Sequence, residues 1–276
     1  MSDRSSVDRR SFLRTTGAST IGLASLAALS SQPLVAKAAA ATQSKDNPDN
    51  KKDKPSKGDI QILIAAEIAE ALAVTTYTSI INFAPFFARI PGDDQGYLEA
   101  ARQEEMSHYL LEQSVTGQPS PFSIFYYPPG MFESAQTTLN VLVTLEDAFI
   151  AAYLVGVRQF STPDFRVTAA RIMGIESDHR TLARVIGPDV APIDGGPIGE
   201  ITGIQGTAES TAPPNNNGYE RTLLWTNIDQ ALAALQPFVD IVAASKAGFD
   251  IRRPYVFAPF TPTLPQELGA FHTFLG

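Results

Sequence analysis

The sequence contains the pattern Glu-x-x-His twice, at Glu105–His108 and at Glu176–His179. The chain has only three histidines, so two of the three take part in this pattern. In the stretch 171–186, RIMGIESDHRTLARVI, helical spacing puts Glu176 and His179 on one stripe with apolar residues that should face a core. A carboxylate is costly to bury without a charged partner. The pattern therefore restricts the fold to helices that enclose a polar centre.

Four long stretches of the chain show helical periodicity and are separated by turn residues. The first and second stretches, and the third and fourth, have short connections, which predicts two antiparallel helical hairpins. A proline-rich segment, 117–134, is long enough to run the length of a bundle and join the hairpins. We therefore predict an all-α four-helix bundle over residues 58–187. Its helices are expected at about 59–83, 93–116, 134–160 and 163–187, the last with Thr162 as N-cap and a stop at Gly187–Pro188.

The two helices without a Glu-x-x-His motif each offer a glutamate of their own. These are Glu70 in the first helix and Glu146 in the third. A tyrosine follows each glutamate after seven residues, at Tyr77 and Tyr153. Seven residues are close to two helical turns, so each tyrosine shares a face with its glutamate. We expect these tyrosines either to support the centre directly or to be core residues with bonded hydroxyls.

The predicted hairpins put these glutamates on one level. In an antiparallel hairpin, two residues lie level when they are equally far from the turn. The midpoint of Glu146 and Glu176 is position 161, and that of Glu70 and Glu105 lies between positions 87 and 88. Both midpoints fall in predicted turns, so the ligands of each hairpin should meet at one height in the bundle.

This combination of residues is the pattern of a di-metal carboxylate centre. Four buried carboxylates would be costly when ionised, and two divalent cations would supply the matching positive charge. We expect Glu105 and Glu176 to bridge the ions, while Glu70 and Glu146 bind one ion each. The chain has no cysteine, so the donors are oxygen and imidazole nitrogen, which suits iron or manganese and leaves open positions for dioxygen or peroxide. The predicted metal ligands are Glu70, Glu105, His108, Glu146, Glu176 and His179.

The helix order, the paired motifs and the Glu-to-Tyr spacing resemble the ferritin-like superfamily. The stretch 62–77, ILIAAEIAEALAVTTY, together with an export signal and a long extension, resembles exported ferritin-like proteins grouped with plant desiccation-related proteins. The resemblance implies a di-metal site but no single reaction, since relatives include ferroxidases, peroxidases, manganese catalases and stress proteins. Glu67 lies one turn before Glu70 and is the alternative ligand; Glu70 is preferred because Tyr77 follows it.

The first 38 residues have the three parts of an export signal. Arg9 and Arg10 precede Ser11-Phe12-Leu13, followed by an alanine-rich apolar run, and this resembles a twin-arginine signal peptide. Residues 39–57 are charged and read as a disordered linker. We therefore expect a periplasmic or extracellular protein with no stable membrane anchor after cleavage. Removing residues 1–38 leaves 16 basic against 27 acidic residues, which argues against nucleic acid as a partner.

Residues 188–276 form a predicted C-terminal extension that is rich in glycine and loops. We expect a short hairpin near 198–204 and a fifth helix at about 219–247, bent at Pro237. An aromatic, proline-rich tail should pack as an extended strap over its own domain or over a neighbouring subunit. His272 in this tail has no partner motif and is expected to be structural.

The sequence leaves two classes of function open. The first is an oxidoreductase whose di-iron or di-manganese centre acts on peroxide, dioxygen or ferrous iron. The second is a non-catalytic structural or stress-protective protein that a metal site stabilises. Oligomerisation of the chain is left open as well. Near the centre, Glu104 is expected to be a solvated neighbour, and Glu112 either a support for the ligands or an exposed residue.

Overall fold

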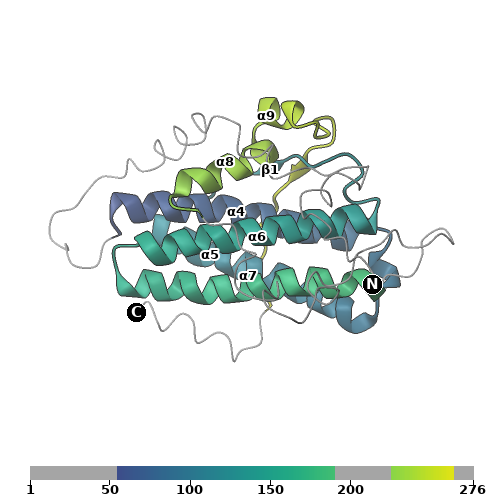
Figure 1. Cartoon of the computed structure of the whole chain (residues 1–276), viewed down its shortest axis with the longest axis horizontal. Coiled ribbons are helices and arrows are strands. Elements are labelled where there is room, and N and C mark those ends of the chain that lie inside the picture. Colours follow the sequence, from purple (N-terminus) through teal and green to yellow (C-terminus); the bar gives the residue numbers. More distant parts are fainter. Residues whose placement is uncertain (1–54, 190–224, 264–276) are drawn as a thin grey trace, which may run out of the picture.

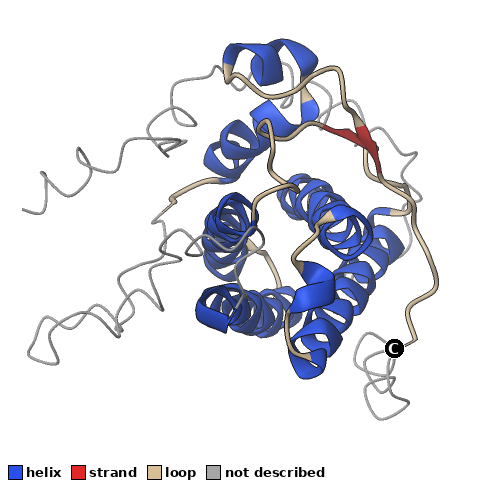
Figure 2. Cartoon of the chain, turned by 90° about the vertical axis from the view of Figure 1, so that its right-hand side faces the viewer, coloured by secondary structure: helices blue, strands red, loops and turns tan. Residues whose placement is uncertain are grey.

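Four long helices form the body of the protein in a computed structural model, which describes residues 55–189 and 225–263. Helix α4 packs along α5 and helix α6 along α7, so each pair is a hairpin (Figure 1). Contacts between α4 and α6 and between α5 and α7 close the bundle, which Figure 2 shows nearly end-on. The predicted all-α bundle of two hairpins is confirmed. Its helices are α4 (Lys57–Phe83), α5 (Gly92–Thr116), α6 (Ala135–Gln159) and α7 (Pro163–Asp189).

The ends of the bundle helices follow from capping residues in the sequence. Ser56 and Asp59 form a reciprocal capping box, so α4 begins at Lys57, inside the predicted linker. The side chain of Ser134 caps α6, and the Thr162 hydroxyl accepts a hydrogen bond from the backbone of Phe165, as expected for the N-cap of α7. Helix α7 runs on to Asp189, so the predicted stop at Gly187–Pro188 was wrong by two residues, a difference that is common at fraying helix ends.

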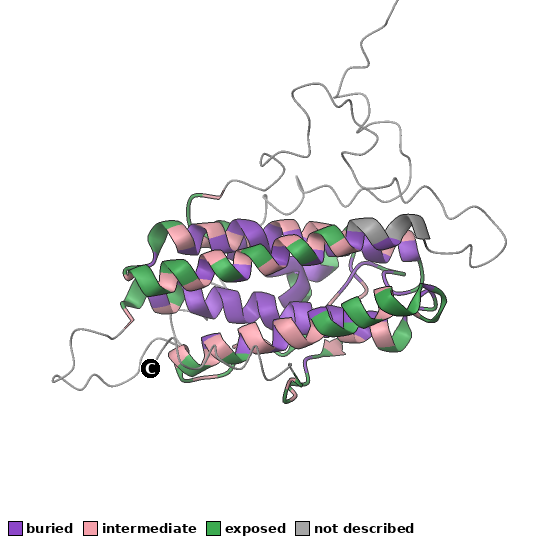
Figure 3. Ribbon diagram, turned by 90° about the horizontal axis from the view of Figure 1, so that it is seen from below, coloured by how far each residue is buried: buried purple, intermediate pink, exposed green. Residues whose placement is uncertain are grey.

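Helix α4 lies at the centre of the core. Buried residues cover its whole circumference in the middle of the helix, because α5, α6 and the extension surround it. The other bundle helices bury one face and expose the opposite one, as Figure 3 shows. Helices α4 and α6 are long and apolar enough to cross a membrane by length and composition. Packing inside the bundle accounts for the apolar character of α4, since most of that stretch is buried.

The crossover between the hairpins is fixed by the C-terminal extension. Strand β1 (Ile124–Phe125) of the crossover pairs antiparallel with strand β2 (Tyr255–Val256) of the extension. The backbone amide of Tyr126 also donates to the carbonyl of Phe238. Phe257 then packs edge-on against Tyr109 of α5. The described part of the predicted strap therefore lies over its own domain, and the crossover contains a strand pair that the sequence did not predict.

The predicted fifth helix is two helices, α8 (Ile228–Val239) and α9 (Ile241–Lys246). Residues 225–227 are not helical, because Asn227 forms the N-terminal capping box of α8. The break falls at Asp240 and not at Pro237: Asp240 is extended, ends α8 and caps α9 with its side chain. Helix α8 packs on α4 and α6.

Several predictions lie outside the described residues. These are the signal peptide 1–38, the linker up to residue 54, the hairpin near 198–204, the start of the fifth helix at residue 219, and His272.

Candidate metal centre

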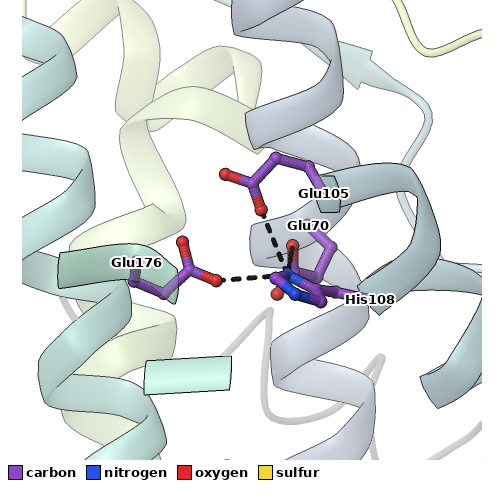
Figure 4. A group of neighbouring side chains, drawn as sticks. All are labelled: Glu70, Glu105, His108 and Glu176. Carbon is purple, nitrogen blue, oxygen red and sulfur yellow. Dashed lines mark ion pairs between the residues drawn. The ribbon is translucent and has the colours of Figure 1, made fainter. Parts of the chain in front are cut away.

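The six predicted ligands converge at the centre of the bundle. They form two groups, and within each group one donor atom from every residue lies within 4.8 Å of the others. One group contains Glu70 and His108, the other Glu146 and His179, and both contain Glu105 and Glu176. Figure 4 shows the three carboxylates of the first group directed at the His108 ring. The structure thus brings together the six residues selected from the sequence, and their role as ligands stays a prediction.

The two shared carboxylates divide their oxygens between the groups. Glu105 places Oε2 at 3.5 Å from Nδ1 of His108 and Oε1 at 2.9 Å from Nδ1 of His179. Glu176 does the same, with Oε1 at 3.3 Å from Nδ1 of His108 and Oε2 at 3.5 Å from Nδ1 of His179. Each shared carboxylate therefore offers one oxygen to each position, which is the arrangement of a bridging ligand.

The helices set this geometry through spacing and through their turns. A residue and its neighbour three positions later share one helix face, so each Glu-x-x-His motif points both side chains inward. The turn between α4 and α5 contains the short helix η1 (Phe87–Arg89), and the turn between α6 and α7 spans residues 160–162. Both calculated midpoints fall in these turns. The glutamates of each hairpin therefore lie at one level, as their distances from the turns predicted.

Within the described structure, the atoms of these six residues that face the centre are not engaged by other parts of the protein. The inward oxygens and ring nitrogens of the six residues are buried, and none of them has a hydrogen-bond partner outside the centre among the described residues. A buried polar group without a partner is destabilising, and finding so many of them in one place calls for a missing partner. Two cations would meet this need, so the residues present fit a di-metal centre. The atoms concerned are Glu70 Oε2, Glu105 Oε1 and Oε2, His108 Nδ1, Glu146 Oε2, Glu176 Oε1 and Oε2, and His179 Nδ1.

The protonation of the metal-free centre follows from burial and mutual repulsion. Burial, together with the charges of Glu105 and Glu176, raises the pKa of Glu70 and of Glu146. Burial also opposes ionisation of Glu105, but the adjacent His179 and hydrogen bonds from both histidines hold the pKa of that carboxyl below its usual range. The pKa of each histidine is raised because the surrounding carboxylates outweigh burial. Protons thus compensate the carboxylates of the metal-free protein, and cations would displace them.

The two tyrosines bond across the bundle. Tyr77 of α4 donates to Oε1 of Glu146 at 2.7 Å, and Tyr153 of α6 donates to Oε1 of Glu70. Each tyrosine therefore supports the glutamate of the opposite hairpin. The sequence paired each tyrosine with the glutamate seven residues before it on the same helix, but the Tyr77 hydroxyl reaches Glu146 on α6 and not Glu70. The ring of Tyr77 also packs edge-on against that of His179, with centroids 5.7 Å apart.

Three further glutamates surround the ligands. Glu104 was expected to be a solvated neighbour, but its Oε2 lies 2.9 Å from Nε2 of His179, so it fixes the imidazole from outside the centre. Glu112 is buried, and its Oε1 lies 2.7 Å from the hydroxyl oxygen of Tyr153. Glu67 accepts a hydrogen bond from Thr116 and belongs to neither ligand group. Of the two alternatives on α4, Glu70 is therefore the one that lies in the centre.

A four-helix bundle with paired Glu-x-x-His motifs and two inward glutamates defines the class of carboxylate-bridged metal proteins. Comparison with known families agrees with this class: residues 58–186 match the family model described as "Ferritin-like domain". This match, over a little less than half of the chain, supports the ferritin-like superfamily that the sequence pattern indicated. The sequence shows no significant match to a curated protein or to a solved structure.

Proposed function

We propose that the protein is an exported di-metal carboxylate protein that binds two iron or manganese ions and uses them to react with peroxide or dioxygen or to oxidise ferrous iron. Glu70 and His108 would hold one ion, Glu146 and His179 the other, and Glu105 and Glu176 would bridge them. The signal-like N-terminus favours export, and the resemblance of the chain to desiccation-related proteins favours a role in stress protection.

The observation that carries the proposal is the division of donor atoms into two groups with two shared carboxylates. A single cation would leave one group of buried donors unpartnered. Two divalent cations balance the four ligand carboxylates and give each of the inward donors a partner.

The same donor set favours redox chemistry with a small oxidant. Each group supplies four protein donors, one from each of its residues. Iron and manganese commonly bind more ligands than this, which leaves positions for a small molecule. When bound, such ions would supply the electrons for reduction of a small oxidant. Tyr77 and Tyr153 hold the side chains of Glu146 and Glu70 in place. Glu104 orients the ring of His179.

Metal loading followed by an oxidant assay tests the proposal. The full chain should bind two Fe²⁺ or Mn²⁺ ions under anaerobic conditions, as measured by elemental analysis after gel filtration. Addition of peroxide or dioxygen should then consume the oxidant and change the absorption of the metal centre. His179→Ala should abolish this reaction, whereas Asp178→Asn, which changes an exposed carboxylate beside it, should retain it.

Two results would contradict the proposal in different ways. Failure of the wild-type chain to retain either metal would exclude the di-metal centre. The chain could instead retain two ions and gain melting temperature from them but consume no oxidant. This result would exclude the oxidoreductase and leave a structural metal site.

A further inference from the structure

An apolar cavity of about 30 Å³ lies among the four bundle helices beside the predicted metal centre. Its lining comes from α4, α5, α6, α7 and the first residue of α8, Ile228. Polar atoms form almost none of its wall, although Glu112, Tyr153 and Thr168 border it. Apolar cavities of this kind stay dry, because a water molecule inside would lack hydrogen-bond partners. The cavity therefore suits a small apolar molecule better than it suits water.

The cavity begins one helical turn from the predicted ligands. Each bundle helix contributes to the lining a residue three or four positions away from one of its ligands, on the same helix face. These residues are Ala66 of α4, Glu112 of α5, Phe149 of α6 and Ile172 of α7. The residues one turn away on the opposite side of the centre instead pack in the main apolar core, and they are Val74, Ala101, Leu142 and Ala183. The cavity thus borders the centre from one side of the bundle.

Tyr153 connects the cavity to the position of Glu70 and His108. Its side chain borders the cavity, and its hydroxyl donates to Oε1 of Glu70. Ala69, which precedes Glu70 in α4, borders the cavity as well. A molecule held in the cavity is therefore one side chain away from a predicted ligand of this ion.

Small side chains keep the space open. Four of the lining residues are alanines, at positions 66, 69, 152 and 169. The open space costs packing contacts that larger apolar side chains would restore. At its outer end the cavity is bordered by the half-buried residues Val115, Phe165 and Ile228. Rotamer changes of such side chains are fast, which gives a small molecule a route between solvent and the cavity.

Of the two oxidants in the proposed function, dioxygen matches this cavity. A cavity needs about 10–15 Å³ to hold one water molecule, so this one has room for a diatomic molecule and not for a larger organic one. Dioxygen has no hydrogen-bond donor and loses little on leaving water. Hydrogen peroxide has two O–H groups, which would be left without partners against an apolar wall.

We propose that this cavity binds dioxygen and passes it to the ion beside Glu70 and His108, which makes dioxygen the preferred oxidant of the centre. This inference rests on the proposed function and narrows it. Reduction of dioxygen to hydrogen peroxide takes up two electrons and two protons. Two ferrous ions that become ferric would supply the electrons, and the solvent would supply the protons.

Paramagnetic broadening by dissolved dioxygen tests the binding without metal or turnover. The metal-free full chain, labelled at its isoleucine and leucine methyl groups, is measured by NMR under nitrogen and under dioxygen. Dioxygen in the cavity should broaden the methyl signals of Leu63 and Ile172, which border it, more than those of Ile80 and Leu139 in the main core. All four side chains are buried, so contact with dioxygen in bulk water is small for each.

Variants that fill the cavity make this measurement specific. Ala66→Leu fills the space next to the centre, and Val115→Phe fills the outer end, where a half-buried site tolerates a larger side chain. Ala170→Leu is the matched control, at a half-buried alanine of α7 outside the lining. Both filling variants should lose the extra broadening at Ile172, and the control should keep it. Equal broadening of Ile172 and Ile80 in the wild type, or unchanged broadening in both filling variants, would overturn the proposal.

Oxidant consumption by the Fe²⁺-loaded chain tests the route to the centre. In both filling variants dioxygen consumption should slow by about tenfold, the lower end of what one methylene too many costs in an apolar pocket. Peroxide consumption should keep the wild-type rate, because the His108 side chain is 11% exposed and gives a polar reactant a separate approach. Unchanged dioxygen consumption, or equal slowing with both oxidants, would overturn the route.

The two measurements separate failure of this inference from failure of the proposed function. A chain that binds Fe²⁺ and consumes dioxygen without extra broadening at Leu63 and Ile172 would overturn the inference alone. A chain that shows the broadening but retains no metal or consumes no oxidant would refute the proposed function and the route, while dioxygen binding in the cavity would stand.

Discussion

Glu67 allows the electrostatic cost of this core to be measured at one residue. Its side chain is fully buried, and burial raises its pKa from 4.5 to about 7, against the hydrogen bond from Thr116. Between these pH values the folded protein holds a proton that the unfolded chain has lost. The contribution of Glu67 to the free energy of unfolding therefore falls as the pH rises through this window.

The perturbation that isolates this effect is Glu67→Gln. Glutamine has nearly the same shape, accepts the hydrogen bond from Thr116 and does not titrate. With the pKa raised from 4.5 to about 7, linkage gives about 2.5 kcal/mol of lost stability between pH 5 and pH 8. We expect Glu67→Gln to gain this amount relative to the wild type when stability is measured at pH 8 instead of pH 5.

Urea unfolding of the metal-free full chain in the presence of a chelator measures this difference. The other titrating groups are common to both proteins and largely cancel. Glu99→Gln, which changes an exposed glutamate on α5, provides the same change in charge at the surface. The reasoning is refuted when Glu67→Gln and Glu99→Gln show the same dependence of stability on pH.

Three other perturbations test separate parts of the structure. Glu104→Gln should weaken Mn²⁺ binding by about tenfold, because Glu104 orients His179, and an unchanged affinity in a metal titration would contradict this. Gly156→Ala would place its Cβ 2.8 Å from the Phe160 ring where α6 meets α7, so denaturant unfolding should show a loss of about 1–3 kcal/mol; wild-type stability would mean that the ring moves freely. The metal-free protein should lose stability as the pH rises above neutrality, since the raised pKa of Glu70 and the raised pKa of each ligand histidine both act in this direction, and bound metal should remove the trend in thermal melts.

The sequence predicted the structure well wherever the geometry of a single helix determines where a residue lies. Periodicity and capping residues located the four helices, and the spacing of Glu105 and His108 placed both side chains on one face. Equal distances from the turns then placed the ligands on one level. These inferences need only the geometry of single helices and of an antiparallel hairpin.

The sequence was less informative wherever a side chain reaches another helix. The rotation of each helix about its axis decides whether the Tyr77 hydroxyl meets Glu70 or Glu146, and no local pattern fixes that rotation. The bond between Glu104 and His179 has the same origin, since it joins α5 to α7. The break falls at Asp240 and not at Pro237, because α8 continues through the proline whereas the capping aspartate sets the boundary.

The two hairpins repeat one ligand pattern but give the centre two different surroundings. The position of His108 and Glu70 borders Tyr153 and two buried carboxylates, while that of His179 and Glu146 has apolar residues at the equivalent sites. Glu104 bonds His179, and the residue of α7 in the equivalent place is an isoleucine, which offers His108 no acceptor. A purely structural metal site would need neither difference, because the ligand carboxylates alone neutralise the charge of the ions and the bound ions join the helices. An asymmetric environment matters when the two ions have different tasks, so loss of Glu104 should weaken binding of the ion beside His179 more than binding of the ion beside His108.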